Sequence, residues 1–225
     1  MTTLVTGTAT IEFCNALTVN SCEIRHVENP QTGDFDGVSS LYHVTNPFDP
    51  DSVAKANNVF ALARAACVST LGWQARLGPY DVTTQAGRNL ADIHGAVWHA
   101  GLPFFIAQPA YPLEWVTAWD SRSPVDPAVT LPWIGQADLA AAVAVLLQRS
   151  DHEGGIYELC RRRGSVRKMA GQADIVHDIS GELDRLPEEQ RALAEPVFAR
   201  LSDGISNGNP AMLDWLLSPA GDETP

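Results

Sequence analysis

The chain opens with a short apolar segment that stops at a glycine. Residues 4–7 read LVTG, which is typical of a buried strand that ends in a tight turn. Apolar residues then return in residues 11–17, as expected for a helix. A strand, a glycine and a helix in this order bring a helix N-terminus next to the end of a strand, an arrangement that suits a bound phosphate group. The first fifteen residues therefore predict the start of an α/β nucleotide-binding unit.

The alternation of strand and helix patterns continues through most of the chain. Strands are predicted at residues 23–27, 38–44, 66–70, 104–107, 131–134 and 155–159. Helices are predicted at residues 51–65, 87–99 and 137–148. Strands that alternate with helices imply right-handed crossovers and a parallel sheet. We therefore expect an α/β protein with a Rossmann-like parallel sheet flanked by helices.

The pattern changes after residue 160. Residues 161–163 form a short arginine run, and residues 187–202 and 212–217 have an amphipathic, helical pattern. No further strand–helix alternation follows. We therefore predict a Rossmann-like domain over residues 1–160 and a helical C-terminal cap or tail over residues 161–225.

Composition restricts the partners. The formal net charge is −12, which disfavours binding to nucleic acid or to anionic membranes. The four cysteines are scattered and predict neither a disulfide framework nor a metal site. No basic leader and no apolar run of roughly 18 residues is present. We expect a cytoplasmic protein that acts on a small molecule, with a homodimer as one option for its assembly.

Four stretches together resemble a known family. They are residues 4–7, AGLPF at 100–104, LPWI at 131–134 followed by ADLA at 137–140, and GIYEL at 155–159. In the order and spacing of these stretches, the chain resembles the NmrA-like atypical short-chain dehydrogenases. In that family a segment like AGLPF leads a central strand, a segment like LPWI with ADLA precedes a helix, and a segment like GIYEL closes the sheet. The resemblance covers roughly residues 3–160 and implies an NAD(P)-binding Rossmann-like fold.

The chain departs from this family on the cofactor side. Of the family's glycine fingerprint only Gly7 remains, with Thr10 and Phe13 at the other two positions. The basic residue that usually follows the second strand is replaced by Glu28, which could hold a ribose hydroxyl, although a solvated carboxylate is the commoner role. Only residues 29–36 remain where the family has a strand and a helix, so we expect part of the adenine-side scaffold to be missing.

The redox signature of short-chain dehydrogenases, a tyrosine followed four residues later by a lysine, is also absent. None of the four tyrosines has this partner, and the two lysines are Lys55 and Lys168. Together with the lost glycines, this predicts that the protein works without a cofactor. NAD(P) is the alternative, in which Gly7, Thr8 and Thr10 would contact the nucleotide.

Ligands of open α/β sheets bind beyond the carboxyl ends of the strands. Three residues predicted there could carry chemistry. His43 has an intrinsic pKa suited to proton transfer, Glu114 could act as an acid in an apolar loop, and Ser69 matches the family's strand-end serine and could bind a carbonyl. Each of the three side chains could instead have a purely structural role. For a histidine inside a strand, the structural role is the more common one.

Aromatic residues are frequent in the same loops. Substrate-binding residues are predicted to be Trp73, Gln108, Tyr111, Trp115, Trp133, Thr45 and Asn46, with Trp119 beside them. An aromatic wall with few polar groups is suited to a flat or polyene-like substrate, but tryptophans also fill cores. His94 and His99 are five residues apart, so no metal is expected.

These observations favour a non-redox enzyme on a degenerate dehydrogenase scaffold. A cyclase, isomerase or dehydratase that tailors an apolar or aromatic natural-product intermediate would need only a few acid–base groups in such a pocket. The alternative is an NAD(P)H-dependent oxidoreductase with a degenerate glycine motif. A second alternative is a non-catalytic sensor or regulator of the NmrA type.

Overall fold

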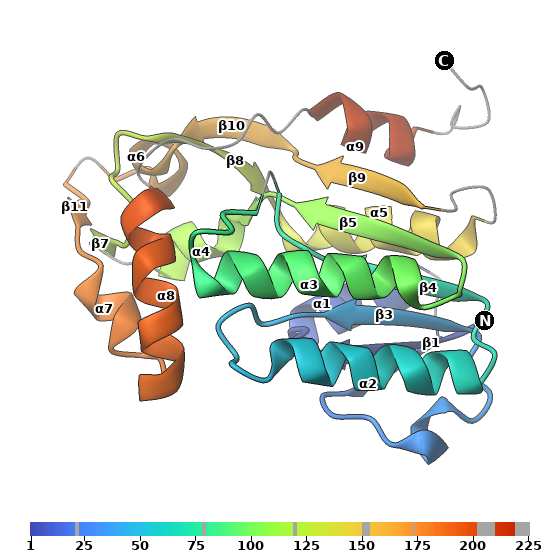
Figure 1. Ribbon diagram of the computed structural model, residues 1–225. Helices are drawn as coiled ribbons and strands as arrows, with labels where there is room; N and C mark the ends of the chain where they lie inside the picture. The colour runs from blue at the N-terminus through green and yellow to red at the C-terminus, as the bar shows by residue number, and fades with distance from the viewer. Residues whose placement is uncertain are drawn as a thin grey trace.

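The computed structural model describes residues 1–20, 23–77, 80–118, 121–149, 154–172, 174–201 and 210–218. Its centre is a six-stranded sheet in the order β2-β1-β3-β4-β5-β9, in which every neighbouring pair is parallel (Figure 1). The strands are β1 (Thr2–Gly7), β2 (Glu23–Val27), β3 (Ser40–Val44), β4 (Thr70–Gln74), β5 (Phe104–Pro109) and β9 (Gly155–Leu159). The predicted α/β fold with a Rossmann-like parallel sheet is confirmed.

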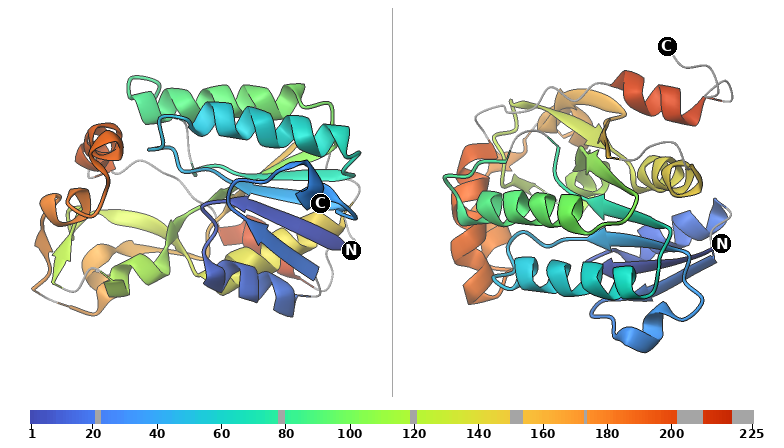
Figure 2. Two further views of the ribbon diagram at one scale, coloured as in Figure 1. Left: turned by 90° about the horizontal axis from the view of Figure 1, so that it is seen from below. Right: turned by 45° about the vertical axis from the view of Figure 1, so that its right-hand side comes forward.

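Helices cover both faces of this sheet. Figure 2 shows α2 (Ser52–Ala65) and α3 (Gln85–His99) on one face, and α1 (Ile11–Val19) and α5 (Gln136–Gln148) on the other. Helix α9 (Pro210–Leu217) packs on α5 and β9, and its Leu213 and Leu216 are buried in the same apolar cluster as α5. The sheet therefore lies between two separate cores, one for each helical layer.

A smaller lobe lies at the carboxyl edge of the main sheet (Figure 1). Its three-stranded sheet joins β6 (Tyr111–Pro112), β8 (Thr130–Ile134) and β10 (Arg162–Ser165). A two-stranded sheet of β7 (Arg122–Ser123) and β11 (Val176–His177) lies beside it, with α4 (Leu113–Ala118), α6 (Val166–Ala170), α7 (Ser180–Leu183) and α8 (Glu188–Leu201). The residues after 160 thus share one core with earlier residues around Trp133. The division at residue 160 stays a prediction.

The strand predicted at 66–70 is wrong, because β4 begins only at Thr70. Helix α2 ends in a Schellman turn: the Val68 amide donates to the Ala63 carbonyl, and the Cys67 amide donates to the Arg64 carbonyl. Cys67 occupies the left-handed region with φ 55°. The apolar residues that resemble a strand therefore close the helix, and the strand lies about four residues further on.

The sheet has a single strand beyond β1, as the short segment 29–36 predicts. Strand β2 is the edge strand, and a loop with the 3₁₀ turn η1 (Thr32–Phe35) leads from it to β3. Within the part of the chain that the structure describes, no helix is long and apolar enough to cross a membrane.

Candidate functional site

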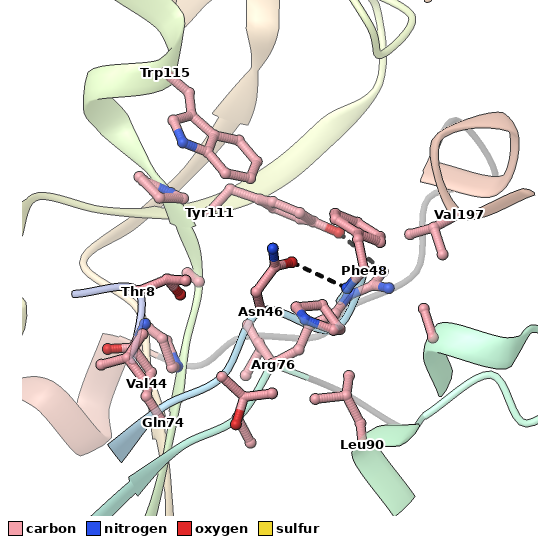
Figure 3. Close-up of a pocket in the computed structure, with 18 of the residues that line it drawn as sticks. Thr8, Val44, Asn46, Phe48, Gln74, Arg76, Leu90, Tyr111, Trp115 and Val197 are labelled. Atoms are coloured by element: carbon pink, nitrogen blue, oxygen red, sulfur yellow. Dashed lines mark hydrogen bonds between the residues drawn. The ribbon is translucent and has the colours of Figure 1, made fainter. Parts of the chain in front are cut away.

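A cavity of about 360 Å³ lies where the carboxyl ends of the main strands meet the smaller lobe (Figure 3). It falls within the usual size range of small-molecule sites. Its walls come from the segments after β1, β3 and β4, from β6 and α4, and from α8 in the C-terminal part. Segments far apart in the sequence therefore form one cavity.

Among the described residues, five aromatic side chains line this aromatic cavity: Phe48, Tyr80, Tyr111, Trp115 and Phe198. Phe48, after β3, packs against Phe198 of α8 with ring centroids 6.0 Å apart. Tyr111 lies between Trp115 and the buried Trp133, with both ring centroids 6.2 Å away. Aromatic side chains in a cavity wall suit contact with a flat, conjugated ligand.

One cation faces this apolar space. Arg76 follows β4 and is half-buried, and its Nη2 donates to the Tyr111 hydroxyl at 3.2 Å (Figure 3). It is the single lysine or arginine among the described residues that line the cavity. No carboxylate lies within ion-pair distance of it in the described ranges.

A tyrosine in the same wall has two nitrogen neighbours. The Tyr80 hydroxyl lies 3.1 Å from His94 Nδ1 on α3, and Gln108 Nε2 of β5 donates to it at 3.5 Å. Burial raises the pKa of Tyr80 above its ordinary value, and burial also lowers the pKa of His94. Both groups are therefore neutral near pH 7, and Tyr80 retains a proton that it can donate.

The turn after β1 keeps its glycine for a steric reason. Gly7 has φ +79°, and a Cβ there would come within 2.0 Å of the Val44 carbonyl oxygen. The Thr10 hydroxyl accepts from the Phe13 amide at 3.2 Å and caps α1. The Phe13 side chain is buried and stacks on Tyr42 at a centroid distance of 5.5 Å. The two residues that replace glycines thus cap the helix and fill the core.

A second, polar hollow of about 100 Å³ adjoins the first. Both are lined by Thr8, Val44, Thr45 and Asn46. The polar hollow extends toward β2 and has Gly7, Glu28, His43, Lys55 and Asn58 among its walls. Together the two hollows follow the carboxyl edge of the sheet from the β2 side to the β5 side.

Several predicted site residues lie at these hollows. Thr45, Asn46, Tyr111 and Trp115 line the aromatic cavity, as do Thr8 and Thr10, and Gly7 lines the polar hollow. Trp119 lies outside the described residues.

His43 faces the polar hollow rather than the aromatic cavity. It is 4 % exposed, and its Nδ1 lies 2.8 Å from Thr6 Oγ1. Burial lowers the pKa of His43 from 6.5 to about 4, so the ring is neutral near pH 7. This neutral, enclosed imidazole does not line the aromatic cavity, and its catalytic role stays a prediction.

Other predicted residues lie away from the cavity. Trp73 and Trp133 are fully buried, and their indole N–H groups donate to Thr45 Oγ1 at 2.9 Å and to the Gly164 carbonyl at 2.8 Å. They were expected to bind substrate because they lie close to strand ends in the sequence, but both fill the core. Gln108, also buried, reaches the site through Tyr80.

Two of the predicted catalytic residues, Ser69 and Glu114, form hydrogen bonds to backbone groups. Ser69 precedes β4 and donates to the Ser39 carbonyl at 2.7 Å, so it lies at the amino end of the sheet, opposite the cavity. Its predicted place at the carboxyl end is wrong because the strand was assigned too early. The Glu114 carboxylate accepts from the Gln136 amide at 2.8 Å, at the start of α5, where the helix dipole favours a negative charge.

The sequence does not predict five residues that lie at or beside the cavity: Phe48, Arg76, Tyr80, His94 and Phe198. A correct end for β4 would have selected Arg76 and Tyr80, because both follow that strand. No sequence pattern indicates that Phe198 of the C-terminal helix reaches the cavity.

Comparisons with solved structures identify the fold. The triphenylmethane reductase of Citrobacter sp., complexed with NADP(H), is 16 % identical with a TM-score of 0.71, over 100 % of this chain and 97 % of that one. The NADPH-dependent quinone oxidoreductase of Escherichia coli, complexed with NADPH, is 14 % identical with a TM-score of 0.70, over 97 % and 95 %. A nucleoside-diphosphate-sugar epimerase of Staphylococcus aureus is 11 % identical with a TM-score of 0.73, over 96 % and 95 %. The chain has the same Rossmann-like fold as these proteins. No protein-family model and no curated protein sequence matches it.

The expectation that no cofactor is needed is contradicted by these comparisons. Two of the similar structures hold NADP(H) or NADPH in this fold. The expectation relied on side chains at positions 10 and 13 blocking the phosphates. In the structure Phe13 is directed into the core, and the Thr10 hydroxyl is bonded to the helix it caps. The tight turn at Gly7 and the hollow beside it remain, so neither side chain removes the place where a phosphate would lie in this fold.

Proposed function

We propose that the protein is an NAD(P)H-dependent reductase of a flat, conjugated acceptor. The observation that carries the proposal is the pair of adjoining hollows on the carboxyl edge, one polar and one aromatic. A dinucleotide joins an adenosine half to a nicotinamide half through a pyrophosphate, and we assign the polar hollow to the adenosine side and the aromatic cavity to the nicotinamide side. The aromatic cavity continues beyond the shared residues and leaves room for the acceptor.

This chain's residues have distinct parts in holding the cofactor. The turn at Gly7 and the hydroxyls of Thr8 and Thr10 would face the pyrophosphate at the start of α1. Glu28 and Asn58 offer oxygen and amide groups to the ribose and adenine. When bound, NAD(P)H supplies a hydride.

The acceptor would lie against the aromatic walls, where Phe48 and Phe198 keep water from one side and Trp115 covers another. Tyr80 is the proton donor of this proposal. With the His94 proton on Nδ1, Tyr80 accepts from His94 and from Gln108, and its own O–H is free for the acceptor oxygen. The same two N–H donors would stabilise the phenolate that remains, and a positioned acid is worth about 10²–10⁴-fold in rate.

The first test is dinucleotide binding. Calorimetric titration with NADH and NADPH is expected to give a Kd of about 10 μM or tighter for at least one of them, or roughly −7 kcal/mol. Oxidation of that dinucleotide is then followed with quinones and triarylmethane dyes as acceptors. Absence of saturable binding by either dinucleotide would refute the proposal.

The second test is a matched pair of tyrosine variants. Tyr80→Phe is expected to lower turnover of a carbonyl acceptor about 10²–10⁴-fold without loss of dinucleotide binding. Tyr157→Phe on β9, outside the cavity, is the control and should keep wild-type turnover. Equal turnover in both variants would exclude Tyr80 as the acid.

A non-redox cyclase, isomerase or dehydratase for an apolar or aromatic natural-product intermediate is the second candidate. The Tyr80–His94 pair favours it, because that pair could move a proton within the aromatic cavity without net hydride transfer. Product formation with no net change in dinucleotide would select this function. Dinucleotide binding with no turnover of either kind would select a sensor of the NmrA type.

A further inference from the structure

Arg76 and Tyr111 form a hydrogen-bonded pair in the wall of the aromatic cavity. Arg76 Nη2 donates to the Tyr111 hydroxyl, and Figure 3 shows the two side chains meeting beside Phe48. A tyrosine hydroxyl that accepts this bond still has its own O–H to donate. The pair therefore offers several N–H and O–H donors to one point of the cavity.

Within the described ranges, the hydrogen-bond partner of Arg76 is the Tyr111 hydroxyl, and no carboxylate lies within ion-pair distance of its guanidinium. Asp81 also lines the cavity, but its Oδ1 accepts from the amide of Thr83 at 3.1 Å and from its hydroxyl at 2.5 Å. A half-buried guanidinium among aromatic rings is costly unless a ligand supplies the counter-charge.

We propose that the acceptor is a planar organic anion, whose charged oxygen binds Arg76 and Tyr111 while its ring lies between the aromatic walls. This inference rests on the proposed reductase function and names its substrate class. The chain carries a formal net charge of −12, so its overall field repels an anion, and recognition depends on this local cation. Guanidinium binds carboxylate-type oxygens with two parallel N–H bonds, which gives orientation as well as affinity.

The dinucleotide pyrophosphate is the other anion that could reach Arg76. The position of Arg76 favours the acceptor. Arg76 follows β4 and is bonded to Tyr111 in the smaller lobe. The Gly7 turn, which would face the pyrophosphate, is instead bonded to β3, because the Thr8 amide donates to the Val44 carbonyl. The experiment below separates the two anions.

The probes are two naphthoquinones of nearly equal shape. 2-Hydroxy-1,4-naphthoquinone is ionised near neutral pH, and 2-methyl-1,4-naphthoquinone is neutral. Binding of each is measured by quenching of tryptophan fluorescence without dinucleotide, so the result does not depend on reduction. The wild type is expected to bind the anion at least about tenfold more tightly, as a charge-assisted pair predicts.

The variants are Arg76→Met, Arg76→Lys and Tyr111→Phe, with Arg64→Met as the matched control. Arg64 is an exposed residue near the end of α2 and does not line the cavity, so its replacement changes net charge equally. Arg76→Met is expected to weaken anion binding about 10–100-fold and to change binding of the neutral quinone less than about threefold. Arg76→Lys should recover part of the loss, and Arg64→Met should behave as the wild type.

Three results would overturn the inference. Equal loss for both quinones in Arg76→Met would show a purely structural role, and unchanged binding of both would show no role. Loss of dinucleotide binding with retained anion preference would assign Arg76 to the cofactor phosphates. If the anion preference holds but no dinucleotide binds, the reductase function fails while the anion site stands. Melting temperatures of all four variants check that each is folded.

Discussion

The buried His43 makes stability depend on pH in a defined window. The ring is 4 % exposed, and burial lowers its pKa from 6.5 to about 4. Between these two values the unfolded chain binds a proton that the folded chain excludes. Stability is therefore complete above the unfolded pKa and is lost progressively as pH falls toward the folded pKa. A difference of this size corresponds to about 3 kcal/mol.

The test compares the wild type with His43→Gln. Glutamine has no titrating ring and keeps an amide that can bond to Thr6, whose hydroxyl now lies 2.8 Å from His43 Nδ1. Urea unfolding from about pH 7 to about pH 4 gives the free energy of unfolding of both proteins. His94, whose pKa is also lowered by burial, titrates in both and cancels in the difference.

The wild type should lose about 3 kcal/mol more than the variant across this window. Asp49, Asp138 and Asp178 have pKa values held below their ordinary 3.8, so their contributions are lost mainly at lower pH. Parallel pH profiles for the two proteins would refute the account of His43 as a neutral, enclosed base.

Three further predictions follow from local geometry. Gly72→Ala should cost about 1–3 kcal/mol in urea unfolding, because its Cβ would lie 2.5 Å from Phe105 and 2.7 Å from Tyr42; a neutral result would mean that these rings move freely. Cys67→Gly should raise stability by about 1 kcal/mol, since glycine adopts the observed φ of 55° without strain, and a loss of stability would contradict the Schellman turn. Glu28→Gln should improve NADPH binding relative to NADH in calorimetric titrations, because the carboxylate in the polar hollow repels a phosphate; an unchanged ratio would place the ribose elsewhere.

Most of the fold follows from local patterns. β2 matches its predicted residues, 23–27, and α2 and α5 differ from theirs by one residue, because each pattern is local. The prediction for β4 is wrong because Ala66, Cys67 and Val68 after α2 are apolar, although Val68 is bonded back to the helix. A non-glycine residue in the left-handed position of that turn removed the usual signal for a helix end.

Cavity residues that directly follow a strand could be predicted from the sequence. Pairs of residues that are distant in the sequence could not. The rule for carboxyl ends found Thr45, Asn46 and Trp115. It could not find pairs such as Arg76 with Tyr111, which become neighbours only when the smaller lobe folds over the sheet. It also could not separate Trp73, which ends in the core, from Trp115, which is 41 % exposed.

The turn at Gly7 has a consequence for how a glycine at this position is interpreted. Any side chain there would collide with the Val44 carbonyl, whether or not a nucleotide is ever bound. Position 7 is therefore fixed by the sheet itself, whereas positions 10 and 13 are set by the helix cap and the core. A glycine at position 7 of a chain with this fold is thus no sign of a bound nucleotide, because the backbone of β3 alone requires it.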